Sequence, residues 1–74
     1  MAFQNLPVAY KIATYNRAQR RGDVARIAAE TGYSESMVSR TLRGLRNNET
    51  IVNKGYRLIK DRQSNLQRLM TATA

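Results

Sequence analysis

The residues that decide the fold read RIAAETGYSESMVSRTLRG, from Arg26 to Gly44. Two apolar-patterned segments flank the turn TGYS, in which Gly32 supplies a positive φ angle that other residues resist. Ser34 is a preferred N-cap residue, and Tyr33 and Val38 stand at the two positions of a hydrophobic staple. A short helix, a glycine turn and a second helix with a defined starting angle favour a helix-turn-helix over a plain helical hairpin.

Helical periodicity and cap signals predict four helices, over residues of about 7–20, 24–31, 35–46 and 49–70. Pro7 suits the first turn of the first helix, Gly22 is expected to close that helix, and Asp23 is expected to N-cap the second. No segment alternates with period two, so neither a sheet nor a β-hairpin wing is expected. The expected fold is all-α: a compact helix-turn-helix domain of four helices over residues 1–74, with the motif at 24–45 and a long C-terminal helix.

The same periodicity predicts which residues form the core. The third helix is expected to bury Val38, Leu42 and Leu45, because these positions share one helical face. The tyrosines sit at helical core spacing, which favours burial over stacking on bases: Tyr10, Tyr15, Tyr33 and Tyr56. Gly55, inside the fourth helix, either admits a close neighbour or marks a bend, because glycine weakens a helix interior by roughly 1 kcal/mol.

Composition points to the kind of partner. The 74 residues carry a net charge of +8, which favours a polyanion, either nucleic acid or an anionic membrane surface. The absence of Cys and His excludes disulfides and the usual zinc ligand sets, so no metal or other cofactor is expected. No apolar run approaches the ~20 residues that span a bilayer, and no signal peptide is evident at the N-terminus. We therefore expect a soluble cytoplasmic protein.

The stretch IAAETGYSESMVSRTLRG resembles the helix-turn-helix of bacterial and phage repressors, especially that of the Lac repressor family. Ile27-Ala28, Gly32 to Ser34 and Val38 to Arg40 match the family pattern of residue types and spacing, whereas Thr41 occupies a slot that is usually apolar. The resemblance covers about twenty residues. It implies a sequence-specific double-stranded DNA-binding regulator, of the repressor type and of bacterial, phage or plasmid origin. No effector domain accompanies the motif, so no small-molecule effector is expected.

In that family the second helix of the motif lies in the major groove. The resemblance therefore implies base contacts from Glu35, Ser36, Ser39, Arg40 and Arg43. Arginine pairs bidentately with guanine, serine contacts either kind of base, and glutamate accepts from cytosine. The alternative is an ordinary solvated face, in which Glu35 only complements the helix dipole.

Other residues around the motif are expected to contact phosphates. They are Arg17, Arg20, Arg21, Arg26, Ser34, Arg46, Asn47, Asn48 and Lys54. The last four cluster where the third helix meets the fourth, although turn formation and N-capping explain Asn47 and Asn48 equally well.

In the fourth helix, apolar and amide residues step by four and three, as in a heptad repeat. Its distal part lies too far along the helix to reach the core of so small a domain. A homodimer interface is therefore expected at Gln63, Leu66, Leu69 and Met70, with a frayed tail as the alternative.

A second class of function stays open, namely a sequence-tolerant protein that bends or packages DNA. Competition with random DNA separates this class from a sequence-specific regulator. Catalysis is not expected, because the sequence lacks His, Cys and a glycine-rich phosphate loop.

Overall fold

The computed structural model describes the backbone of residues 6–73 and the side chains of residues 6–67. This described chain contains no strand and forms four helices: α1 (Val8–Ala18), α2 (Asp23–Thr31), α3 (Glu35–Leu42) and α4 (Glu49–Thr73). The predicted all-α fold with a long C-terminal helix is confirmed.

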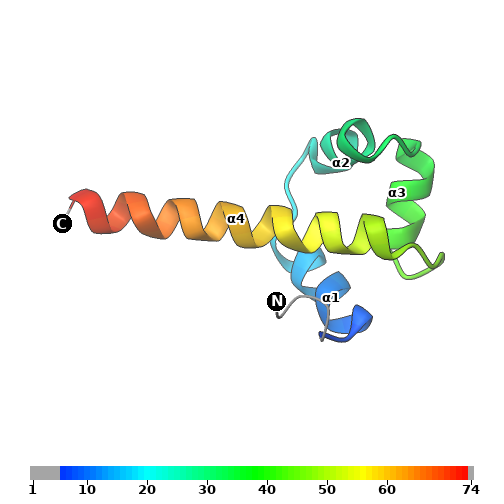
Figure 1. Ribbon diagram of the computed structural model, residues 1–74, viewed down its shortest axis with the longest axis horizontal. Helices are drawn as coiled ribbons and strands as arrows, with labels where there is room; N and C mark the ends of the chain where they lie inside the picture. Colours follow the sequence, from blue (N-terminus) through cyan, green and yellow to red (C-terminus); the bar gives the residue numbers. More distant parts are fainter. Residues whose placement is uncertain (1–5, 74) are drawn as a thin grey trace.

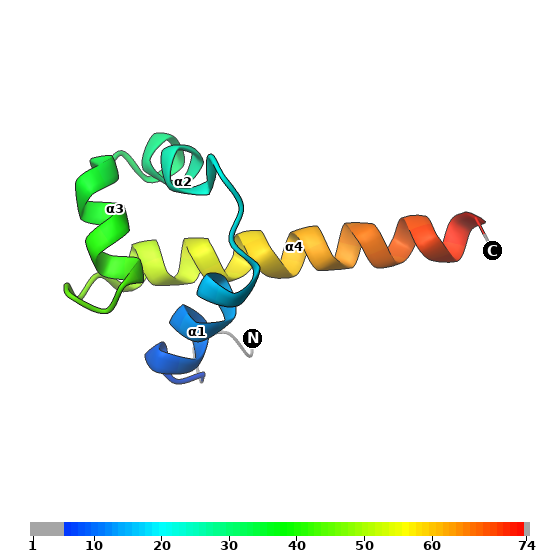
Figure 2. The same cartoon turned by 180° about the vertical axis from the view of Figure 1, so that it is seen from behind.

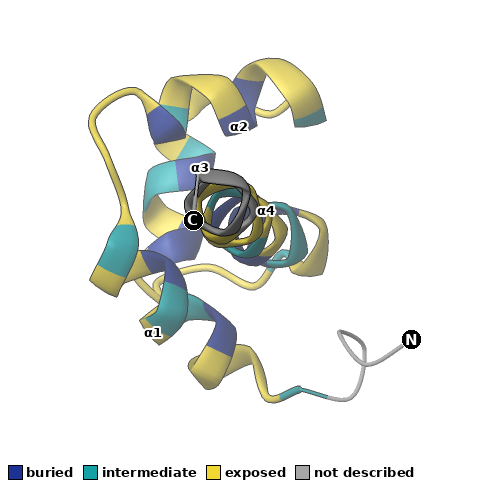
Figure 3. Ribbon diagram, turned by 90° about the vertical axis from the view of Figure 1, so that its left-hand side faces the viewer, coloured by how far each residue is buried: buried dark blue, intermediate teal, exposed yellow. Residues whose placement is uncertain are grey.

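Helix α4 is the axis around which the other helices are arranged (Figure 1). Seen along α4, the helices α1, α2 and α3 curve around one side of it, and the buried residues lie between them (Figure 3). All three gather at the N-terminal half of α4, so that its C-terminal half extends alone into solvent (Figure 2). The molecule is consequently elongated, with extents of 42 × 27 × 19 Å.

The junction between α1 and α2 differs in detail from the prediction. Pro7 precedes α1 as its N-cap residue, and the helix ends at Ala18 without a glycine. Gly22 does adopt a left-handed conformation, with φ of 93°, but it stands directly before α2 instead of closing α1. Gly32 ends α2 as predicted, with φ of 83° and its N–H donated to the Ala28 carbonyl.

Asp23 is not the N-cap of α2, contrary to the prediction. It is the first residue of the helix, and one of its carboxylate oxygens accepts the backbone N–H of Arg20 at 2.7 Å. The other pairs with Arg62 of α4 at 2.6 Å. Burial alone would raise the pKa of Asp23, but the hydrogen bonds from Arg62 and from the Arg20 backbone outweigh it and hold that pKa below its ordinary value.

The start of α3 agrees with the sequence. The hydroxyl oxygen of Ser34 accepts the N–H of Met37 at 3.1 Å, which confirms Ser34 as the N-cap. Val38, four residues after the cap, is completely buried. Tyr33 remains 40% exposed and Tyr10 47% exposed, so the prediction of buried tyrosines holds only for Tyr15 and Tyr56.

The end of α3 comes four residues earlier than predicted, at Leu42. Gly44 has a φ of 84°, and the N–H groups of Gly44 and Leu45 return to the carbonyls of Thr41 and Arg40. This pair of bonds is a Schellman motif, which closes a helix. Leu45 is therefore 67% exposed and not part of the core, contrary to the prediction, whereas Thr41 is fully buried.

The core joins all four helices. Its buried members are Tyr15, Ile27, Ala28, Val38, Leu42, Ile51, Leu58 and Ile59. Gly55 of α4 faces this core, because a Cβ atom placed there would lie 3.2 Å from Leu42 Cδ2 and 3.3 Å from Tyr15 Cδ1. Of the two roles predicted for Gly55, the close approach of neighbours is the one observed.

A polar contact also secures α1 to α4. The ammonium group of Lys11, which is only 5% exposed, donates to the side-chain carbonyl of Asn53 at 2.6 Å. Lys11 and Tyr15 are four positions apart and lie on the same face of α1, which explains why Lys11 is buried.

Replacement of Asp23 by asparagine tests the ion pair with Arg62. We expect the free energy of unfolding at pH 7 to fall by roughly 2–3 kcal/mol, because one partner of a largely buried pair is left without its counter-charge. Since the folded-state pKa of Asp23 is lowered, the stabilisation is present above pH ~4 and is lost as the pH falls through the folded value. Denaturant unfolding followed by circular dichroism between pH 7 and pH 2 measures both effects.

The matched control is Asp61→Asn, because Asp61 is an exposed carboxylate on the same helix as Arg62. It should leave stability within about 0.5 kcal/mol of the parent chain. An acid-induced loss of stability that is equally large in Asp23→Asn and in the parent chain would contradict the assigned role of the pair.

Replacement of Gly55 tests the close packing on α4. Gly55→Val should lower the free energy of unfolding by more than about 2 kcal/mol, because its methyl groups meet Leu42 and Tyr15. Gly55→Ala should change it by less than about 1 kcal/mol, since better helix propensity offsets the contact. The control Ser64→Val, on the exposed part of α4, should be nearly neutral. Equal effects of valine at both positions in urea unfolding would refute this packing account.

Candidate nucleic-acid interface

The outer face of α3 carries the polar side chains that the sequence predicts to contact bases. Ser36 and Arg40 are exposed on the face opposite the buried Val38 and Leu42, and Glu35 is exposed in the first turn of the helix. The Ser34 cap and the buried face fix the orientation of α3 on the body of the domain. The hydroxyl oxygen of Ser34, predicted to meet a phosphate, is already an acceptor within this cap.

The remaining two predicted base contacts lie toward α1. Ser39 is half-buried and Arg43 is the exposed C-cap residue of α3. Both line a cleft of about 290 Å³ between α1 and α3, together with Tyr15, Asn16, Gln19, Val24 and Leu42. Burial raises the pKa of the Tyr15 hydroxyl, and the nearby Asp23 carboxylate raises it further.

Asn16 and Gln19 of this cleft were not predicted from the sequence. The amide group of Asn16 donates to the carbonyl of Leu42 at 3.0 Å, so α1 holds the C-terminal end of α3 in place. Asn16 directly follows the buried Tyr15, but its partner is 26 residues away. No local sequence signal identifies such a contact.

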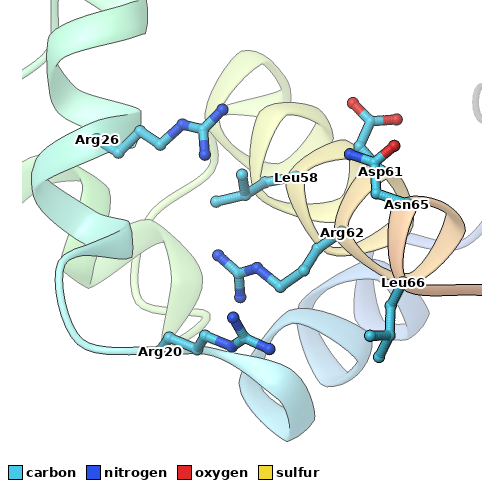
Figure 4. Close-up of a pocket in the computed structure, with 7 residues that line it drawn as sticks. All are labelled: Arg20, Arg26, Leu58, Asp61, Arg62, Asn65 and Leu66. Atoms are coloured by element: carbon cyan, nitrogen blue, oxygen red, sulfur yellow. The ribbon is translucent and has the colours of Figure 1, made fainter. Parts of the chain in front are cut away.

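The predicted phosphate-contacting residues fall into separate groups in the structure. Arg17 lies in the last turn of α1 and Arg21 in the loop that follows, and both are exposed. Arg20 is exposed in the same loop, but its side chain lines a pocket between α2 and α4, where it lies next to Arg62 and across the pocket from Arg26 (Figure 4).

Glu30 forms ion pairs with two of the residues that are predicted to contact phosphates. It pairs with Arg26 and with Lys54, each at 3.0 Å. The hydrogen bonds from Lys54 and then Arg26 hold the pKa of Glu30 below its ordinary value. Lys54, expected to cluster with Arg46 and Asn48, therefore pairs instead with α2.

The loop between α3 and α4 holds the last of these residues. Arg46 and Asn47 are exposed, and Arg46 lies outside α3 because that helix ends at Leu42. The side-chain oxygen of Asn48 accepts the N–H of Ile51 at 3.3 Å, which confirms the N-capping role. These loop residues line a cavity of about 510 Å³ with Val8, Ala9, Ile12 and Val52 as its apolar wall.

The predicted dimer interface is only partly within the described residues. Gln63 is exposed, and Leu66 keeps 54% of its surface exposed. The side chains of Leu69 and Met70 lie outside the described residues.

The described side chains include no cluster of acidic, His or Cys residues able to hold a metal ion. Among the helices as far as they are described, none combines the length and the apolar character needed to cross a membrane. Comparisons with protein-family models, with curated proteins and with solved structures find no match for this chain.

Proposed function

We propose that this protein is a sequence-specific double-stranded DNA-binding regulator of transcription that acts as a repressor through α3. One observation carries the proposal. Helix α3 buries Val38 and Leu42 and presents Ser36 and Arg40 to solvent on its other face, at an angle fixed by the Ser34 cap. A rigid helix with a polar, arginine-bearing outer face has the dimensions and chemistry that the major groove accepts.

Within this proposal, Arg40 reads guanine through its guanidinium group, and Ser36 contacts a neighbouring base edge. Arg43 and Ser39 stand at the side of the groove, next to the cleft formed with α1. The exposed Arg17, Arg21 and Arg46 supply phosphate contacts on the flanks. The net charge of +8 supports the electrostatic part of such binding.

A second candidate is a sequence-tolerant DNA-packaging protein. It is favoured by the position of Arg20, Arg26 and Arg62, which line a pocket between α2 and α4 and not the α1–α3 cleft. Basic groups on several faces suit DNA that wraps around a protein. An excess of random duplex should scarcely affect a sequence-specific complex, but it should abolish a sequence-tolerant one.

Salt dependence tests whether the protein binds DNA electrostatically. With about four to six phosphate contacts per chain, at about −0.9 each in the log–log slope, binding should weaken by two orders of magnitude or more between 50 and 200 mM salt. Fluorescence anisotropy with a duplex selected from a random pool measures this slope. A flat titration is incompatible with the proposal.

Two arginine variants separate base reading from phosphate contact. Arg40→Ala should cost roughly 1–3 kcal/mol on the selected duplex and relax the preference at one base pair. Arg21→Ala should weaken all sequences alike and reduce the salt slope by about one. Both are compared on the selected site, on its single-base variants and on random duplex. A uniform loss in both variants would exclude α3 as the reading helix.

A further inference from the structure

Leu45 is the most exposed of the large apolar side chains in the described chain, with 67% of its surface open to solvent. A single exposed leucine is ordinary on a protein surface. Leu45 differs from such a residue in three respects: its backbone is held by hydrogen bonds, it has no apolar partner at the helix end, and arginines flank it in the sequence.

The backbone that carries Leu45 is fixed relative to α3. The N–H of Leu45 donates to the carbonyl of Arg40 at 2.9 Å, and the N–H of Gly44 donates to that of Thr41 at 3.0 Å. The last residue of α3, Leu42, in turn accepts the side-chain amide of Asn16 at 3.0 Å. Leu45 is therefore presented from a defined position, as a side chain in a binding surface must be.

The end of α3 offers Leu45 no apolar side chain to pack against. In a Schellman motif the second residue after the C-cap frequently packs against the third- or fourth-last residue of the helix. Here those residues are Arg40 and Ser39, whose outer ends are polar. Leu45 also lines neither neighbouring hollow, although Arg43 lines the α1–α3 cleft and Gly44 lines the cavity beside the loop. The motif thus brings Leu45 beside Arg40 and leaves its side chain in solvent.

The surroundings of Leu45 are cationic. Residues 36–48 contain no acid and three arginines, none of which has an ion pair within the described chain. The acids on either side, Glu35 and Glu49, lie in the first turns of α3 and α4. Figures 1 and 2 show the loop that carries Leu45 at the same end of the molecule as α3, projecting beyond it. A polyanion that contacts the outer face of α3 therefore meets Leu45 as well.

We propose that Leu45 is a further specificity-determining residue, whose side chain contacts the C5-methyl group of a thymine in the base pair next to the guanine read by Arg40. This inference rests on the proposed binding of DNA by α3 and names a second element of the preferred sequence. The thymine methyl is the apolar group that a base pair presents in the major groove. Successive bases of a strand are ~3.4 Å apart, so a leucine beside Arg40 reaches the neighbouring base pair.

Replacement of thymine by deoxyuridine tests this contact, because it removes only the methyl group. Each thymine of the selected duplex is replaced in turn, and affinities are measured by fluorescence anisotropy. At one thymine, next to the base pair at which Arg40→Ala relaxes the preference, the parent chain should lose about three- to fivefold in affinity, the effect expected of one methyl group. Leu45→Ala should bind the thymine and deoxyuridine duplexes equally.

Cytosine at the same position provides the converse test. The parent chain should prefer 5-methylcytosine to cytosine by about three- to fivefold, and Leu45→Ala should show no such preference. Leu45→Met keeps a large apolar side chain and should retain most of the methyl response. The control Val8→Ala shortens another exposed apolar side chain, at the start of α1, and should leave the affinity and the methyl response unchanged. Circular dichroism confirms that each variant is folded.

The outcomes separate this inference from the proposed function. If Leu45→Ala keeps the parent's response to deoxyuridine, or if no thymine next to that guanine is sensitive, the role of Leu45 is wrong, while the salt slope and the effect of Arg40→Ala still support DNA reading by α3. If Leu45→Ala weakens every duplex alike and still distinguishes thymine from deoxyuridine, Leu45 contacts a protein and the inference is overturned. A chain that lacks the expected salt slope, or that binds every duplex alike, refutes the proposed function and this inference together.

Discussion

The ion pair between Asp23 and Arg62 is the contact on which the arrangement of the helices depends. It joins the first residue of α2 to the middle of α4, and the same carboxylate holds the backbone of Arg20 in the preceding loop. The place where α2 starts, and hence the position of the helix-turn-helix on α4, follows from this one side chain. The pair also lies at the boundary between the part of α4 that packs against the other helices and the part whose described side chains are exposed.

The orientation of α3 is determined from three directions. The Ser34 cap sets its start, the buried Thr41 and Leu42 set the face turned to the core, and Asn16 holds its last carbonyl from α1. Gly55 allows α4 to approach Leu42 closely, so that the end of α3 is clamped between α1 and α4. A surface helix that must present a few side chains in fixed positions needs this kind of support.

Local signals predict most of the fold, and long-range polar contacts account for most of what they miss. The hydrogen bonds of Gly32 and Ser34 join residues within one or two helical turns of them, and the roles of both residues are predicted correctly. Asp23 is a residue type that favours the N-cap position, but its carboxylate instead pairs with Arg62, which is 39 residues away in the sequence. The predicted α3 is too long because the apolar periodicity continues past Gly44, whereas backbone hydrogen bonds at Gly44 and Leu45 close the helix. In the candidate site, the exposed face of α3 follows from its buried face, whereas the pairing of Arg26 and Lys54 through Glu30 depends on which helices are neighbours.

The unbroken course of α4 makes the two ends of the protein sensitive to insertions in a periodic way. Because each residue turns a helix by ~100° and advances it by ~1.5 Å, one extra residue after Arg62 would rotate everything beyond it to another side of the body. An insertion of seven residues would nearly restore the direction, since two turns of helix contain about seven residues. The effect of an insertion in this segment therefore depends on whether it adds whole helical turns, and not simply on its length. Seven added residues would disturb the relative orientation of the two halves less than one added residue would.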